Sequence, residues 1–160
     1  VWTKGQATLL NLCDTTHLTT GGIQTNNRPW QIMRSIKWNG TDGVLLWDQY
    51  DVDKIAADGT VTHFVDYNSG TDAPVYAICD DGVYAYWVTN VLNAGTPRLR
   101  VYKKLLTADD TVSPTLMITE NSITVTNAVM EYTKERIVMC VNDKVYEFST
   151  SATSLPVFRA

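Results

Sequence analysis

Three stretches of this sequence share one pattern, in which an apolar strand, a tight turn and a second apolar strand follow one another. In the first, residues 31–38 lead through a turn at 39–43 into Val44–Trp47. In the second, Val75–Cys79 leads through Asp80–Gly82 into Val83–Thr89, and in the third, Ala128–Tyr132 leads through residues 133–135 into Ile137–Val141. Self-similarity at a period of roughly 40 to 55 residues indicates a repeat array, in which each unit buries its faces only against its neighbours.

Each repeat continues into further short strands. Asp58-Gly59 predicts a hairpin turn within residues 54–64, Arg98–Leu106 and Thr115–Thr119 extend the second repeat, and Lys144–Phe148 extends the third. In Lys144–Phe148 the alternation places Val145 and Glu147 on the opposite face from Tyr146 and Phe148. The long side chains of Arg98–Leu106 are typical of an outer strand. No window of a dozen residues has the apolar period of a helix with caps.

The sequence therefore predicts an all-β fold of about three propeller-like antiparallel blades. Propellers close with about four to eight blades, so three would leave an incomplete ring. We expect residues 1–29 to form an N-terminal strand and polar loop, and residues 30–160 to form the blades. Because the sequence starts at Val1 without a methionine, we expect the chain to be part of a longer polypeptide. A β-sandwich is the alternative, since it has similar hairpins without needing repeats.

Composition narrows the classes of partner. At 44% hydrophobic residues the chain carries enough apolar material for a packed domain. Its formal net charge of -4 disfavours nucleic-acid binding, which needs clustered Lys and Arg. No apolar run approaches the roughly 20 residues that span a bilayer. The three cysteines are widely separated, which indicates neither a zinc site nor a disulfide framework, and Cys79 and Cys140 are expected to be buried free thiols.

No residue pattern forms a catalytic signature. The two histidines, His17 and His63, are isolated, and no serine lies in a nucleophile-elbow motif. Asp48, Asp51 and Asp53 cluster, but their spacing does not match a calcium-binding loop. We therefore expect a protein that is not an enzyme and that carries no metal or cofactor.

The candidate binding residues are aromatic and acidic side chains near strand ends. They are Trp30, Trp47, Asp48, Tyr50, Asp51 and Trp87. Aromatic rings at strand ends of a repeat array fill the gaps between sheets. If several of them gathered on one exposed rim, they would instead stack on sugar rings or anchor a protein partner.

The loose repeat pattern, carried by Asp58–Phe64, Val83–Thr89 and Ile137–Phe148, resembles propeller-like regions of bacteriophage tail and tail-tip proteins. The resemblance implies a structural or recognition module of a virion tail. Its partners would be other subunits of the assembly and a host-surface glycan or receptor, bound through loops on one face. The resemblance transfers no functional residue.

Two other functions stay open on the sequence. One is a secreted propeller that binds or cleaves carbohydrate, with the tryptophan and aspartate residues as its site. The other is an intracellular scaffold with an apolar groove on one face. Convergence of the aromatic and acidic side chains in one pocket would favour the carbohydrate function.

Overall fold

The computed structural model describes residues 32–38, 41–47, 51–58, 60–66, 75–93 and 95–156. Within these residues the chain is all-β, with strands and no helix, which confirms the predicted fold class at that level. The strands are β1 (Ile32–Trp38), β2 (Thr41–Trp47), β3 (Asp51–Ala56), β4 (Val61–Asp66), β5 (Val75–Asp80), β6 (Tyr84–Asn93), β7 (Thr96–Leu105), β8 (Thr115–Asn121), β9 (Ala128–Thr133), β10 (Arg136–Val141) and β11 (Lys144–Ser149). No helix in this part of the chain could span a membrane.

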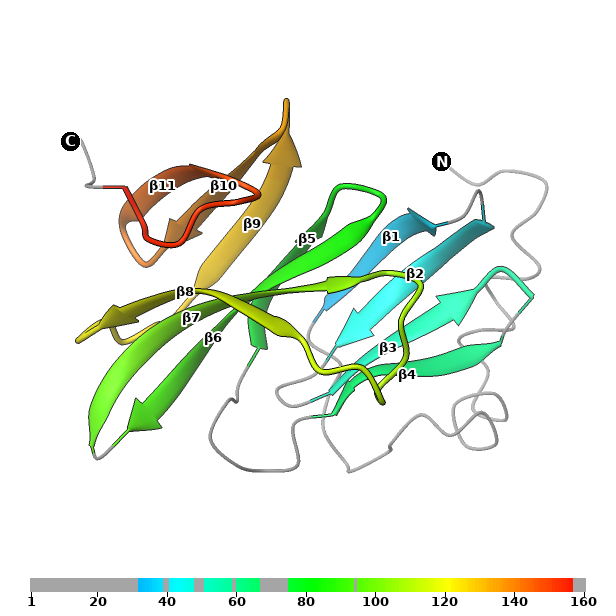
Figure 1. The fold of residues 1–160 in the computed structure, drawn as a ribbon, viewed down its shortest axis with the longest axis horizontal. Coiled ribbons are helices and arrows are strands. Elements are labelled where there is room, and N and C mark those ends of the chain that lie inside the picture. Colours follow the sequence, from blue (N-terminus) through cyan, green and yellow to red (C-terminus); the bar gives the residue numbers. More distant parts are fainter. Residues whose placement is uncertain are drawn as a thin grey trace.

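The strands form three antiparallel sheets, each built from strands that follow one another in the chain (Figure 1). We call them the first sheet (β1–β4), the second sheet (β5–β8) and the third sheet (β9–β11). Consecutive strands pair because short turns return the chain at once, as antiparallel hairpins allow. The first strands of the second and third sheets, β5 and β9, lie side by side (Figure 1).

The second sheet is buried on both faces. Along β6, Ala85 and Trp87 point into the cluster shared with the first sheet, whereas Tyr86 and Val88 point into the cluster shared with the third sheet. This follows from the strand period of two, which sends successive side chains to opposite faces. Since both faces are apolar, the second sheet is the internal layer of the described array.

Two apolar clusters hold the three sheets together. The first seam, between the first and second sheets, contains Leu45, Trp47, Val52, Phe64, Val65, Val75, Ile78, Ala85, Trp87, Tyr102 and Leu106. The second seam, between the second and third sheets, contains Ala77, Cys79, Tyr86, Val88, Leu99, Val101, Ile118, Val125, Met130, Ile137, Met139, Val141, Tyr146 and Phe148. Each large side chain buried in this way contributes about 1.5–3 kcal/mol, so the seams are the main source of stability.

Several expectations differ from the structure in detail. β2 begins at Thr41, so the first hairpin turn is shorter than the predicted stretch 39–43. β6 continues to Asn93, because a partner strand of equal length, β7, pairs with it throughout. Cys79 is buried as expected, but Cys140 is only partly buried, because it points to the outer face of the third sheet. Cys13 and the predicted N-terminal strand and loop lie outside the described residues.

Candidate functional site

The outer face of the third sheet, which points away from the second seam, carries a row of apolar side chains. Cys140 on β10 lies opposite Val129 on β9 and opposite Val145 on β11. Val129 is 69% exposed and Val145 is 50% exposed, although both are large hydrophobic residues in regular strands. We call Val129, Cys140 and Val145 the apolar row. It reaches across the full width of the described third sheet.

Polar side chains border the apolar row. In the next cross-strand row, Val138 lies between Glu131 and Glu147, both of which are exposed. The Arg136 Nε and the Glu147 Oε1 are 2.5 Å apart in a solvent-exposed ion pair. Such a pair contributes at most about 1 kcal/mol to stability, so its charges are better seen as part of the surface than of the core. The outer face thus has an exposed apolar row at one end and charged side chains beside it. Protein-binding surfaces likewise combine apolar and polar side chains.

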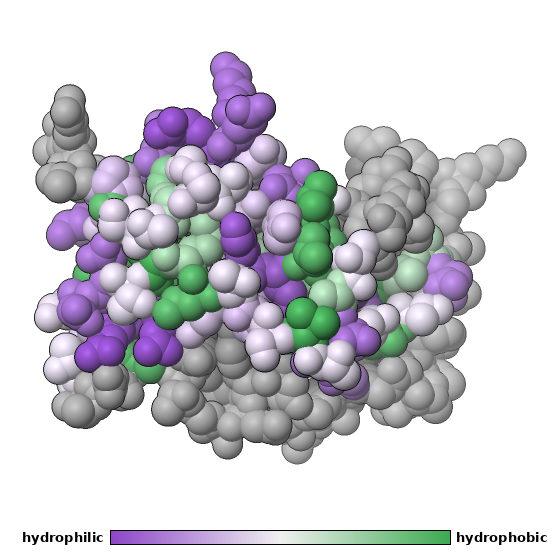
Figure 2. All heavy atoms as spheres, viewed as in Figure 1, coloured by the Kyte–Doolittle hydropathy of each residue, from purple (hydrophilic) through white to green (hydrophobic). Residues whose placement is uncertain are grey.

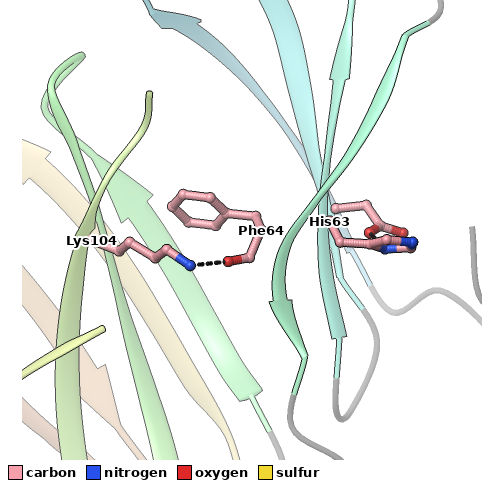
Figure 3. Close-up of polar contacts among 4 residues, drawn as sticks. His63, Phe64 and Lys104 are labelled. Carbon is pink, nitrogen blue, oxygen red and sulfur yellow. Dashed lines mark hydrogen bonds and ion pairs between the residues drawn. The ribbon is translucent and has the colours of Figure 1, made fainter. Parts of the chain in front are cut away.

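Two buried lysines lie beside the first seam, each with its ammonium group near the Phe64 ring. The Nζ of Lys54 is 5.1 Å from the ring centroid and that of Lys104 is 5.0 Å from it. Lys54 donates hydrogen bonds to the backbone oxygens of Leu106 and Ala108, at 2.6 and 2.5 Å. Lys104 donates one to the backbone oxygen of Phe64, at 2.5 Å (Figure 3). The Lys54 bonds connect β3 to the loop that follows β7, and the Lys104 bond connects β7 to β4.

Burial is unfavourable for both ammonium groups. Desolvation, with a smaller effect of the Lys104 charge, lowers the pKa of Lys54 to about 8. Desolvation also lowers the pKa of Lys104, while Asp110 and Asp109 act against this shift. A lysine with a lowered pKa can act as a nucleophile. Here, however, both side chains are at most 4% exposed and donate to backbone carbonyls, so their role is to connect the two sheets.

A second polar pair lies on the opposite face of the first sheet from Phe64 and Lys104, as Figure 3 shows for His63. The His63 Nδ1 is 2.7 Å from the Asp53 Oδ1. Asp53 is 1% exposed, whereas the His63 side chain is 37% exposed. A buried carboxylate needs such a partner, because an unpaired buried charge is strongly destabilising. The His63 ring thus provides a partner for one oxygen of the buried Asp53 carboxylate.

The sequence-predicted candidates do not all fall in the described part of the chain. Trp30, Asp48 and Tyr50 lie outside it, and Asp51 is the first residue of β3, in register with Asp66 of β4. Trp47 and Trp87 both lie in the first seam, 2% and 0% exposed. The structure thus brings these two tryptophans into one cluster inside the protein.

The contacts of Trp87 explain its position. Its ring stacks on Tyr102, with centroids 5.9 Å apart and planes at 21°, and meets Phe64 edge-on at 6.2 Å. Both arrangements are favourable for aromatic pairs and contribute about 0.5–1.5 kcal/mol each beyond the buried area. Among the described residues, this aromatic cluster fills the space between two sheets, which was one of the two interpretations of the sequence.

Sequence reasoning overlooked the apolar row and the two buried lysines as features of interest. The alternation in Lys144–Phe148 places Val145 on the face opposite Tyr146, and the structure confirms this. The same argument, applied to β9 and β10, would have marked Val129 and Cys140 as its neighbours. No local pattern marks Lys54 or Lys104 as buried, because their acceptors lie 40 or more positions away in the sequence.

Hydrophobic residues in the described part form separate patches among hydrophilic ones in the view of Figure 2. No three His, Cys, Asp or Glu side chains of the described residues could together hold a metal ion. The chain matches no protein-family model and no curated protein. Its geometry is therefore the basis for a functional conclusion.

Proposed function

We propose that this chain is a structural and recognition module of a larger protein assembly, and that it binds a protein subunit through the outer face of the third sheet. The observation that carries this proposal is the apolar row, in which Val129 and Val145 are exposed on a regular sheet with charged side chains in the neighbouring row. A protein partner is favoured because burial of exposed apolar side chains drives association, while the neighbouring charged side chains fix orientation.

The size of the row indicates how it would bind. Specific, stable complexes bury about 800 Å² on each partner, far more than the three side chains of the apolar row supply. A single contact through this face is therefore weak. An assembly overcomes this when several copies bind at once or when the same partner makes additional contacts, because each further contact is then intramolecular. Weak, repeated contacts are what a module of a larger assembly would use.

We further propose that the three sheets are arranged like blades of a propeller. Three features support this. Each sheet is a meander of consecutive strands, the first strands of the second and third sheets lie side by side, and both faces of the second sheet are covered. A sandwich would pair two sheets over a single core, whereas here two seams flank one sheet.

Location in a virion tail, with a host glycan or receptor as a further partner, stays a prediction from the sequence resemblance. It would be supported if the protein were a constant component of purified particles. The assembly function itself does not depend on that location.

The test is the native mass of the complex formed by the full chain in the cells that make it. Light scattering on the purified complex should give several times the mass of one chain. In the double variant Val129→Lys/Val145→Lys the mass should fall, because binding would bury two ammonium groups among apolar side chains. The control is Val112→Lys, which alters a valine that is 49% exposed outside the row. A wild-type chain that purifies with the mass of a single chain contradicts the proposal.

A further inference from the structure

In the described part of the chain, the third sheet has one strand fewer than each of the other two sheets. The first and second sheets each contain four strands, and the third contains three, with β11 at its edge. Counting from the first strand of each sheet, β11 takes the position that β3 has in the first sheet and β7 in the second. Both β3 and β7 bond a further strand on their outer side, β4 and β8.

β11 pairs regularly with β10, as the first strands β1 and β9 also do with their neighbours. β10 pairs with β11 over six consecutive residue pairs without a register shift, just as β2 pairs with β3 and β6 with β7. The strands at the outer edges of the other two sheets differ. Pairing of β3 with β4 shifts between Val52 and Asp53, and pairing of β7 with β8 shifts between Val101 and Tyr102. Bulges of this kind distort an edge and protect it from further pairing.

The chain itself does not return along β11 in the part that the structure describes. After β11, the Ala152 N–H donates to the Ser149 oxygen at 3.0 Å, which turns the chain. The Leu155 N–H then donates to the Glu120 Oε1 at 3.1 Å, so residues 150–156 cross to β8 of the second sheet. β11 also contains no proline, which would block pairing. Among the described residues, β10 is therefore the one strand that pairs with β11, and the opposite edge of β11 presents backbone donors and acceptors.

We propose that the outer edge of β11 binds one extended strand of a partner polypeptide, which pairs antiparallel and completes the third sheet to four strands. This inference rests on the proposed function, since the strand would come from another subunit of the assembly. Main-chain hydrogen bonds give such strand addition its affinity, and alternate side chains give its specificity.

The side chains of β11 define the partner strand. Tyr146 and Phe148 are buried toward the second seam, so the partner residues on that face should be apolar. Val145 and Glu147 lie on the outer face, so the partner should place an apolar residue beside Val145 and a basic or neutral polar residue beside Glu147. The partner strand would then add a fourth member to the apolar row.

The experiment supplies such a strand in tethered form. The full chain is extended after Ala160 by a flexible Gly/Ser linker of about 20 residues, which holds an attached segment at millimolar effective concentration. The segment is a hexapeptide that alternates valine with threonine and lysine. Hydrogen exchange of the individual backbone amides is then measured in the extended and the original chain.

The expected result is slower exchange of those β11 amides that point away from β10. If the tether holds the strand at about ten times its dissociation constant, exchange of these amides slows about tenfold. The matched control is the same extension with proline in place of each threonine, which removes backbone donors and prevents strand pairing. It should leave the β11 amides at their original rate.

Two outcomes decide the matter. If the alternating segment protects the β11 amides and the proline segment does not, the result supports binding of an added strand at the outer edge of β11. Unchanged exchange of the β11 amides, while β9 and β10 remain protected and the chain is folded, overturns it. The failure of the proposed function is seen separately in the native mass, which does not depend on the added segment.

Discussion

The two buried lysines beside the first seam predict that the protein becomes more stable as the pH rises above neutrality. Lys54 has an ordinary pKa of 10.5, which the folded state lowers to about 8. Between these two values the unfolded chain holds more protons than the folded one. Stability must then rise with pH across this window, and it is lost again as the pH falls through the pKa of the folded state.

The size of the effect follows from the pKa difference. At 1.36 kcal/mol per pKa unit, a shift from 10.5 to about 8 corresponds to about 3 kcal/mol at most. Between pH 7.5 and 9.5, Lys54 alone should raise the free energy of unfolding by about 2 kcal/mol. The lowered pKa of Lys104 acts in the same direction. Above pH 10 the effect of Tyr86 has the opposite sign. Burial and the contact with Asp81 raise the pKa of Tyr86 in the folded state, so the unfolded chain loses the tyrosine proton first and stability falls as the pH rises.

The assay is urea denaturation at pH 7.5, 8.5 and 9.5 for the wild type and for Lys54→Met. The methionine fills a similar volume and cannot titrate, so the variant should lose about 2 kcal/mol of the rise with pH. Lys144→Met is the matched control, since it removes an exposed lysine and should keep the rise. If the wild type is equally stable at the three pH values, or if Lys54→Met keeps the full rise, Lys54 is not held as a desolvated amine and the account of the first seam is wrong.

Two further predictions concern single sites. Trp87→Ala should lower the free energy of unfolding by about 3–5 kcal/mol, because Trp87 is fully buried against Tyr102 and Phe64. Trp87→Phe keeps an aromatic ring and should lower it less. Equal losses for the two variants in urea denaturation would contradict the stacking argument. Lys134→Asn/Glu135→Gly should raise the free energy of unfolding by about 1 kcal/mol. Both residues have positive φ, 48° and 66°, in the two-residue β9–β10 turn, which asparagine and glycine adopt more readily. An unchanged or lower melting temperature in calorimetry would contradict this.

The sequence could predict the hairpins because their signals are local. Asp80–Gly82 sits between two apolar runs, and the structure places a turn there, with Gly82 at a φ of 83°. The Asp81 carboxylate accepts hydrogen bonds from the backbone N–H groups of Val83 and Tyr84, which is a typical role for aspartate in a turn. The repeat of this pattern along the chain then predicted several antiparallel sheets rather than one.

The seams could not be predicted in the same way, because they depend on which faces meet. The long side chains of residues 98–106 suggested an outer strand, but β7 lies between β6 and β8, and Lys104 is 4% exposed. What makes this position possible is the backbone oxygen of Phe64, on a strand of another sheet. Periodicity shows which residues share a face, but not which carbonyl will lie opposite a given ammonium group.

The two outer faces of the array differ in a way that bears on assembly. On the first sheet, Val44 and Ile55 are at most 8% exposed, and the Asp53 carboxylate beside His63 is buried. On the third sheet, Val129 and Val145 are half exposed or more. The two ends of the array thus differ. The first sheet has buried side chains on its outer face, whereas the third sheet exposes apolar side chains there.

The open end also combines two kinds of contact in one place. Val145 belongs both to the apolar row and to the edge strand β11, so a strand added there would extend the row while it pairs with the backbone. Burial of a small apolar area gives too little affinity to hold a separate protein, and backbone pairing at an edge strand does not by itself select one partner. Together they give one partner both backbone hydrogen bonds and side-chain selection, which is how strand addition reaches specificity. The third sheet is therefore the part of this protein at which a binding partner should be sought first.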